Sequence, residues 1–325
     1  MSLNTHDDGH VENLLSDFCC LSVHQEYNMF FCSTQRFVMI SNIFFRVILF
    51  VLCVAMCCVL APCSFGAGPA LPERVTSFSL AAKPPEQVTL RYLATLPHDR
   101  SAFTQGLLWD GGYLYESTGQ YGQSTVRRVE PKSGKVTASL TLPHRFFGEG
   151  LALVEDSLFL LTWREETCLI FDKATLQFKR EFKYPGEGWG LTYDGESLIM
   201  SNGTNVIRFL DPKTFRRKRE IKVVDTPRNQ RSVPIHHLNE LEWIRGEIWA
   251  NVWQTTRIVR IDPAKGVVLG WFELAPFVPP EHRNDTQECV LNGIAYDPET
   301  QHVYITGKRW SVMYQFQLEM PEKKP

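Results

Sequence analysis

The stretch QGLLWDGGYLYEST, residues 105–118, decides the fold because the chain repeats its pattern four more times. Each copy reads as a short apolar strand, a turn and a second strand with alternating apolar residues. The other copies are EGLALVEDSLFLLTW (149–163), WGLTYDGESLIMSN (189–202), NELEWIRGEIWANVW (239–253) and NGIAYDPETQHVYITGK (292–308). A period of about 40–50 residues with several short strands is typical of β-propeller blades.

A third strand with a turn signature follows each copy, as in VRRVEPKSGK (126–135), and no long segment has a convincing helical period. The sequence therefore predicts an all-β, five-bladed β-propeller over residues 87–320. The last copy has no obvious fourth strand, and we expect VTLRYLATLPH (88–98) to complete that blade and close the ring. Two polar, proline-rich insertions, 223–237 and 276–290, are predicted loops over one face.

The composition is that of a folded globular protein. The 325 residues are 44% hydrophobic and 22% charged, which excludes wholesale disorder, and the net charge of −2 provides no basic field for nucleic acid. Seven of the nine cysteines precede residue 64, which excludes a disulfide-stapled scaffold. Only Cys168 and Cys289 follow, and the sequence leaves their pairing open.

The apolar run VILFVLCVAMCCVLA (47–61) follows Arg46 and precedes small residues. Its 15 residues fit the core of a signal peptide better than a bilayer span, which needs about 20. We expect an export signal over 39–66, with an uncleaved membrane anchor as the alternative, and a periplasmic or secreted propeller. We further expect 1–38 to be a non-structural extension or an over-early start, 67–86 a linker and 321–325 a tail.

The residues that open the five copies differ in chemistry. Because equivalent positions on the inner strands of a propeller converge at one end of its channel, we expect these side chains to lie close together. They are Gln105, Glu149, Trp189, Asn239 and Asn292. The ends of the second strands add Thr118, Trp163, Asn202, Trp253 and Lys308. Polar groups that converge between aromatic walls are typical of a site for a small molecule or a chain end. The alternative is that each residue caps a strand or bonds its own turn.

At these residues the sequence resembles the plant and bacterial type of glutaminyl-peptide cyclotransferase, also called glutamine cyclotransferase. The matching segments include FTQGL (103–107), FFGEGLAL (146–153), GWGLTYDG (188–195), LNELEW (238–243), LNGIAYD (291–297) and ITGK (305–308). The resemblance implies a five-bladed propeller that cyclises a peptide's N-terminal glutamine to 5-oxoproline and releases ammonia. It implies functional residues at Phe103, Gln105, Phe147, Glu149, Trp163, Trp189, Asn239, Trp253 and Lys308.

For that reaction, Glu149 and Lys308 are the catalytic candidates. One carboxylate can accept a proton from the attacking amine and return it to the departing ammonia, the role expected of Glu149. Lys308, Gln105 and Asn239 are candidates for binding the developing oxyanion, in an order that the sequence leaves open. Burial among aromatic rings would raise the pKa of Glu149, whereas Lys308 would lower it.

Two other functions stay open from the residues alone: a metal-dependent lactonase or hydrolase, and a non-catalytic peptide-binding propeller. A calcium site takes 6–8 oxygen ligands, but the opening residues supply one carboxylate and Lys308 would repel a cation. We therefore expect no metal or cofactor. The expected partners are peptides or proteins with N-terminal glutamine, with no nucleic acid, membrane contact only through 43–61 if that segment is uncleaved, and a monomeric ring.

Overall fold

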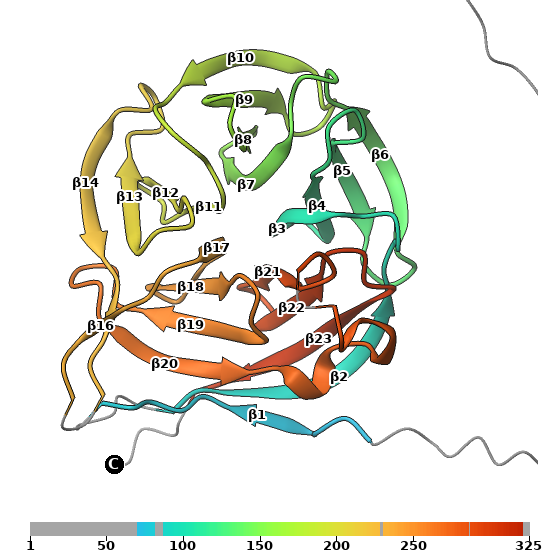
Figure 1. The fold of residues 1–325 in the computed structure, drawn as a ribbon. Coiled ribbons are helices and arrows are strands. Elements are labelled where there is room, and N and C mark those ends of the chain that lie inside the picture. The colour runs from blue at the N-terminus through green and yellow to red at the C-terminus, as the bar shows by residue number, and fades with distance from the viewer. Residues whose placement is uncertain (1–69, 82–86, 228–229, 286, 321–325) are drawn as a thin grey trace, which may run out of the picture. The chain divides into compact units, whose positions relative to one another are not determined.

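The computed structural model describes residues 70–81, 87–227, 230–285 and 287–320. In this part of the chain, five antiparallel sheets of at least four strands are arranged around a common axis (Figure 1). The prediction of an all-β, five-bladed propeller is confirmed. The predicted extension, export signal and tail (1–38, 39–66 and 321–325) lie outside the described residues.

The first four sheets each follow the chain order from one edge to the other. Blade 1 contains β3 (Thr104–Asp110), β4 (Tyr113–Thr118), β5 (Thr125–Glu130) and β6 (Lys135–Thr141). Blade 2 contains β7 (Gly148–Val154), β8 (Ser157–Thr162), β9 (Thr167–Asp172) and β10 (Phe178–Lys183). Blade 3 contains β11 (Leu191–Tyr193), β12 (Leu198–Met200), β13 (Val206–Leu210) and β14 (Arg217–Lys222). Blade 4 contains β17 (Leu238–Ile244), β18 (Glu247–Val252), β19 (Arg257–Ile261) and β20 (Val268–Glu273).

Blade 5 combines strands from the two ends of the described chain. It contains β21 (Leu291–Asp297), β22 (His302–Gly307), β23 (Val312–Glu319), β2 (Thr89–Pro97) and β1 (Arg74–Thr76), and β2 lies antiparallel beside β23. The expected linker 67–86 thus contains a strand, since Arg74 pairs with Arg91 of β2. Because β2 covers the outer edge of β23, backbone groups of that strand find partners inside the same sheet.

The inner strands β3, β7, β11, β17 and β21 pack side by side around the axis. Their close approach explains why a glycine follows the first residue in most copies of the repeat. A Cβ atom on Gly190 would lie 1.9 Å from the carbonyl oxygen of Asn239 in the next blade, and one on Gly150 would lie 2.4 Å from the backbone nitrogen of Leu191. Only a residue without a side chain lets neighbouring blades pack at this distance.

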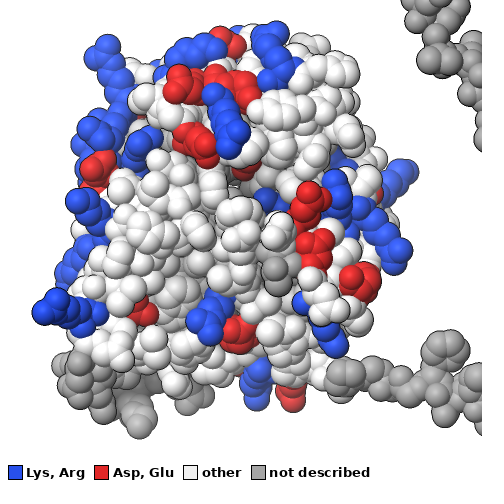
Figure 2. All heavy atoms as spheres, in the orientation of Figure 1, with Lys and Arg blue, Asp and Glu red and all other residues white. Residues whose placement is uncertain are grey.

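Polarity changes from the axis to the rim of the propeller. The five residues Gly148 to Ala152 of the inner strand β7 are buried, whereas most residues of the outer strands β10 and β14 are exposed. The basic run FRRKRE (215–220) falls largely on β14, whose side chains are mostly exposed to solvent. Figure 2 shows Lys and Arg side chains along the rim where β10 and β14 lie in Figure 1.

The two insertions contain more local structure than plain loops. The first forms a ribbon of β15 (Val224–Asp225) and β16 (Val233–Pro234), and the second contains two 3-10 turns, η1 (Ala275–Phe277) and η2 (Pro280–His282). Phe277 is buried in the cluster of apolar residues between blades 4 and 5, so the second insertion is anchored. Cys168 and Cys289 are both free and buried. None of the helical segments in the described ranges is long and apolar enough to cross a membrane.

Candidate active site

A β-bulge marks the residue that opens the repeat in four of the five inner strands. In blade 1 the pairing register shifts between Thr104 and Gly106, so Gln105 lies in the irregularity. The corresponding shifts enclose Glu149 in blade 2, Asn239 in blade 4 and Asn292 in blade 5. A bulge breaks the regular alternation of side chains and can redirect one of them. The bulges therefore place chemically active side chains on strands that otherwise bury apolar residues.

Nine of the ten predicted site residues line a single cavity of about 280 Å³. The tenth, Asn292, is fully buried and lies beside the cavity lining. Its amide nitrogen donates to the carbonyl oxygen of Thr104 at 2.9 Å and to Oε1 of Gln105 at 3.4 Å. The residues that line the cavity are Phe103, Gln105, Gln120, Phe147, Glu149, Trp163, Trp189, Asn239, Trp253, Gln287, Glu288 and Lys308. Asn292 thus contacts Gln105 without lining the cavity, and the amide oxygen of Gln105 accepts from it.

Two second-strand residues, Thr118 and Asn202, have the turn-bonding role that was the alternative for each position. Thr118 Oγ1 lies 2.7 Å from Thr125 Oγ1, and Asn202 Oδ1 accepts a hydrogen bond from Thr204 Oγ1 at 2.6 Å. A larger hollow of about 540 Å³, between blade 4 and the second insertion, contains none of the predicted site residues. The convergence of the predicted residues is therefore specific to the smaller cavity.

Aromatic rings form much of the wall of the cavity. Phe147 contacts Phe103 on one side and Trp163 on the other, with ring centroids 6.2 and 5.4 Å apart. Trp189 meets Trp253 edge to face at 5.6 Å. Because each ring is braced by another, the wall is rigid and largely apolar.

Glu149 is a buried carboxylate in this apolar wall. Burial is the largest effect on its pKa and raises it well above 4.5, Lys308 acts to lower it, and the charges of Glu187 and Glu165 raise it further. Its carboxylate has no hydrogen-bond partner among the described residues. A carboxyl group of this kind exchanges a proton at a higher pH than an exposed one.

Lys308 is a buried cation that lines the same cavity as Glu149. Burial lowers its pKa to about 8, against the opposing attraction of Glu149 and Glu288. Its Nζ lies 4.9 Å from the ring centroid of Phe103. Two buried ionisable groups with oppositely perturbed pKa values in one cavity indicate a catalytic site.

Our reading of the sequence missed several residues at this site. Gln287 and Glu288 line the cavity from the second insertion, and Gln120 lines it from the turn after β4. Glu187 accepts hydrogen bonds from two of the cavity tryptophans. The sequence signal for Glu187 is the segment GEGWG (186–190), which places a carboxylate two residues before Trp189. This glycine-rich segment lacks the strand–turn–helix setting of a dinucleotide-binding loop.

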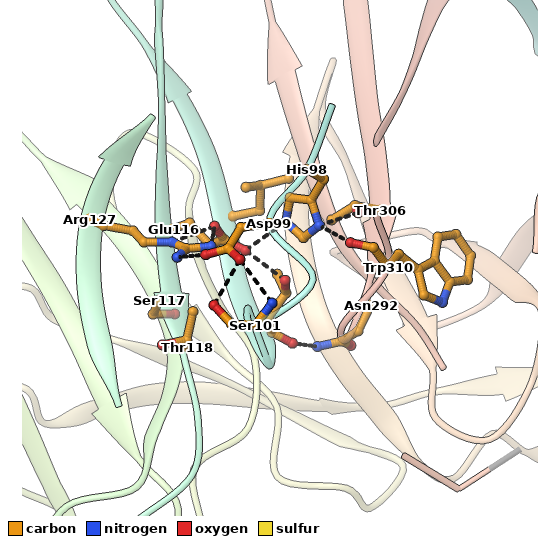
Figure 3. A network of polar contacts seen from close by, with 12 residues as sticks. His98, Asp99, Ser101, Glu116, Ser117, Thr118, Arg127, Asn292, Thr306 and Trp310 are labelled. Carbon is orange, nitrogen blue, oxygen red and sulfur yellow. Dashed lines mark hydrogen bonds and ion pairs between the residues drawn. The ribbon is translucent and has the colours of Figure 1, made fainter. Parts of the chain in front are cut away.

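A buried polar network lies next to the cavity (Figure 3). The Glu116 carboxylate accepts from Thr104 Oγ1 at 2.6 Å and from Arg127 Nε at 2.8 Å, and it lies 3.0 Å from His98 Nε2. The backbone oxygen of Thr104 in turn accepts from Asn292. The network therefore supports the backbone just before Gln105.

The chain is similar to known proteins in sequence and in fold. A family model described as glutamine cyclotransferase matches residues 66–318. A glutaminyl-peptide cyclotransferase of Arabidopsis thaliana is 41% identical over 244 residues, covering 72% of this chain and 73% of the relative. The crystal structure of Myxococcus xanthus glutaminyl cyclase matches with a TM-score of 0.64 and 33% identity, over 72% of this chain and 97% of that one. The family match spans all five blades.

Proposed function

The chain belongs to the glutamine cyclotransferase family, and on that premise we propose how its cavity converts the N-terminal glutamine of a peptide or protein to 5-oxoproline. The activity is that of a glutaminyl-peptide cyclotransferase, a transferase. The observation that carries the proposed mechanism is the pairing of a buried carboxylate, Glu149, with a buried ammonium, Lys308, in one aromatic cavity.

In the proposed reaction, the α-amine nitrogen attacks the carbon of the side-chain amide, and the bond from that carbon to the amide nitrogen breaks. An α-amine has a pKa of about 7.7–8.0, so near neutrality most of it carries a proton that must be removed. Once the ammonium has lost this proton to solvent, the neutral amine attacks, and Glu149 accepts the proton that its nitrogen releases as the new C–N bond forms. Glu149 then delivers that proton to the leaving nitrogen, which departs as ammonia. Such general acid–base catalysis typically contributes about 10²–10⁴-fold to the rate.

The carbonyl oxygen of the substrate amide gains negative charge as the ring closes. We assign Lys308 as the charged donor to this oxygen. Its pKa is lowered to about 8, so it is charged below that pH and loses its charge above it. Gln105 contributes its amide nitrogen as a second donor, while its amide oxygen accepts from Asn292. Asn239 has a buried Oδ1 with no partner among the described residues, so it is available to accept from a nitrogen of the substrate.

The shape of the cavity supports selection for chain ends. Its volume of about 280 Å³ suits one side chain and its backbone, and its aromatic walls would hold a glutamine curled with the amine near its own amide carbon. A glutamine inside a peptide has no free amine, and its backbone amide nitrogen is not a nucleophile. We therefore propose that recognition and chemistry use the same feature of the substrate.

The test of this mechanism is turnover of a peptide that begins with glutamine, followed by mass spectrometry for the loss of ammonia. Glu149→Gln should lower kcat by about 10²–10⁴-fold, since the general base is lost, while peptide binding is retained. Glu155→Gln is the matched control, because Glu155 is exposed on the turn of the same blade, and it should turn over like the wild type.

Three results would contradict the proposal in different ways. Wild-type protein that binds the peptide without converting it would be a peptide-binding propeller. Loss of turnover on chelation would indicate a metal-dependent enzyme instead. Full activity of Glu149→Gln would leave the cyclotransferase activity standing but remove Glu149 from its mechanism.

We also propose that the propeller is a monomer exported from the cytoplasm, with residues 39–66 as the signal or as an uncleaved anchor. The apolar run at 47–61 and its flanking residues support this proposal. Cell fractionation of the full chain, with the mass of the mature protein, distinguishes a cleaved signal from an anchor. Light scattering after size exclusion should give the mass of one chain.

A further inference from the structure

Glu187 lies in the loop between β10 and β11 and contacts two of the tryptophans that line the cavity. Its Oε2 accepts hydrogen bonds from Nε1 of Trp163 at 2.9 Å and from Nε1 of Trp189 at 3.0 Å. Trp163 follows the second strand of blade 2, and Trp189 precedes the first strand of blade 3. A single carboxylate oxygen therefore joins two tryptophans from neighbouring blades.

The same carboxylate also binds the arginine that covers one face of Trp163. Its Oε1 accepts from Nε of Arg164 at 3.2 Å, and the guanidinium carbon of Arg164 lies 3.7 Å from the ring centroid of Trp163. Trp163 is thus held at its edge by Glu187 and covered on one face by the arginine that Glu187 pairs with. A cation stacked on an indole face and a charged acceptor at the N–H edge together restrict rotation of the ring.

Resting on the cyclotransferase activity above, we propose that Glu187 is a positioning residue that holds Trp163 and Trp189 in the mutual orientation needed to enclose the substrate glutamine. It lies outside the cavity lining and acts on the substrate only through the two indole rings. Without it, both N–H groups lose a charged acceptor, and the two indoles are oriented only by their packing against Phe147 and Trp253 and by the Arg164 stack.

The charge of Glu187 has a second effect on the same site. Partial burial acts to raise its pKa, but the hydrogen bonds from Trp189, Trp163 and Arg164 outweigh this and hold it below the ordinary value, so the group is ionised. Its negative charge helps to raise the pKa of Glu149. The other titratable groups coupled to Glu149 are Lys308, Glu165 and the phenols of Tyr121 and Tyr184, both of which have raised pKa values and stay neutral near pH 7, while Glu288 acts on Lys308.

Two substitutions separate the hydrogen bonds from the charge. Glu187→Gln keeps an acceptor oxygen with two lone pairs but removes the charge, and Glu187→Ala removes both. Both should move the acidic limb of kcat/KM to lower pH, because the pKa of Glu149 falls when the nearby negative charge is lost. Only Glu187→Ala should also raise KM, with a loss of kcat/KM of up to about 10²-fold from misplaced walls.

A double-mutant cycle tests whether Glu187 acts through the indole N–H groups. Trp163→Phe and Trp189→Phe keep an aromatic ring and remove the N–H donor. Each should lower kcat/KM in the wild type and have little further effect in Glu187→Ala. Glu165→Gln is the matched control: it removes another charge that raises the pKa of Glu149 but makes no hydrogen bond to either indole. It should shift the acidic limb without coupling to the tryptophan substitutions.

Wild-type turnover of the glutamine-initiated peptide is measured first in the same assay. If the wild type is inactive, the proposed function fails. If the wild type is active but Glu187→Ala has an unchanged KM and the cycles are additive, the positioning role is overturned and the function stands. Should Glu187→Ala not fold, as judged by circular dichroism, Glu187→Met replaces it because it keeps the side-chain length and lacks the acceptor. The same two outcomes decide the test with that variant.

Discussion

At the scale of single residues, the site depends on two buried charges that solvent does not stabilise. Burial raises the pKa of Glu149 and lowers that of Lys308, so both groups exchange protons closer to neutrality than their exposed counterparts. A proton acceptor matched to an α-amine and a cation poised to meet an oxyanion are what the cyclisation needs. In the proposed mechanism, the aromatic wall therefore shifts the pKa values of the two reacting groups as well as holding the substrate.

This arrangement predicts an alkaline limit to activity. Lys308 carries its charge below its pKa of about 8 and loses it as the pH rises further, so kcat/KM should fall above that pH. In Lys308→Arg the cation stays charged at all accessible pH values, and the alkaline limb should move to higher pH even if the maximal rate is reduced. The measurement is a pH profile of kcat/KM for both proteins, and an unmoved limb in Lys308→Arg would contradict the assignment.

At the scale of secondary-structure elements, the inner strands combine bulges with glycines. The bulges re-aim the first residue of a repeat, and the glycine that follows lets the next blade approach. Blade 4 departs from this pattern, because Glu240 stands where other blades have glycine. Its buried carboxylate accepts from the backbone nitrogens of Leu107 in blade 1 and Ile294 in blade 5, at 3.3 and 2.9 Å. Glu240 therefore links three inner strands across the axis.

The close approach predicts that Gly190→Ala is strongly destabilising. The added Cβ would lie 1.9 Å from the carbonyl oxygen of Asn239, so the backbone beside a cavity residue must move. Overpacking of this kind costs about 1–3 kcal/mol or more, and kcat/KM should fall with it. Chemical denaturation measures the change in the free energy of unfolding. Ser139→Ala, on the exposed face of β6, is the control and should change stability by less than about 0.5 kcal/mol.

At the scale of the whole propeller, closure depends on blade 5 and on the polar network beside it. His98 follows the closing strand β2, and its Nδ1 lies 2.7 Å from the carbonyl oxygen of Trp310, just before β23. Its other nitrogen meets Glu116 of blade 1, which pairs with Arg127 (Figure 3). The network thus connects the first and last blades at the seam of the ring.

From this network we predict that Glu116→Gln lowers the stability of the fold in a pH-dependent way. Burial acts to raise the pKa of Glu116, but Arg127 and His98 outweigh it and lower the pKa to about 2, from 4.5. A lowered pKa stabilises the folded state above about pH 4.5, and that contribution disappears as the pH falls towards 2. At pH 7 the substitution should lower the free energy of unfolding by about 3–5 kcal/mol, because the buried Arg127 loses the carboxylate that compensates its charge.

The measurement is the free energy of unfolding of the wild type and of Glu116→Gln between pH 7 and pH 3. The difference between the two proteins should become smaller as the pH falls. Glu181→Gln breaks an exposed pair with Lys183 and is the control, since such pairs contribute about 0–1 kcal/mol. A difference that stays constant with pH would show that the Glu116 charge does not stabilise the seam.

The sequence alone determined the blades and most of the cavity. Five copies of one strand pattern predict five blades, and closed repetition brings their first residues together because equivalent positions of a ring share one end of its axis. The unusual chemistry of those positions, and the resemblance carried by their motifs, identified nine residues of the lining. The closing segment at 88–98 was also visible as a strand without a partner in its own part of the chain.

Only the tertiary structure separated residues that share a position in the repeat but not a role. Asn292 opens its copy as Asn239 does, yet it turns to Thr104 and Gln105 while Asn239 lines the cavity. Glu187 lies outside the repeated position altogether, and its contacts join indoles from two blades. Side-chain direction at a bulge, burial and the distance between charges all depend on packing between blades, so they arise only when the ring is closed.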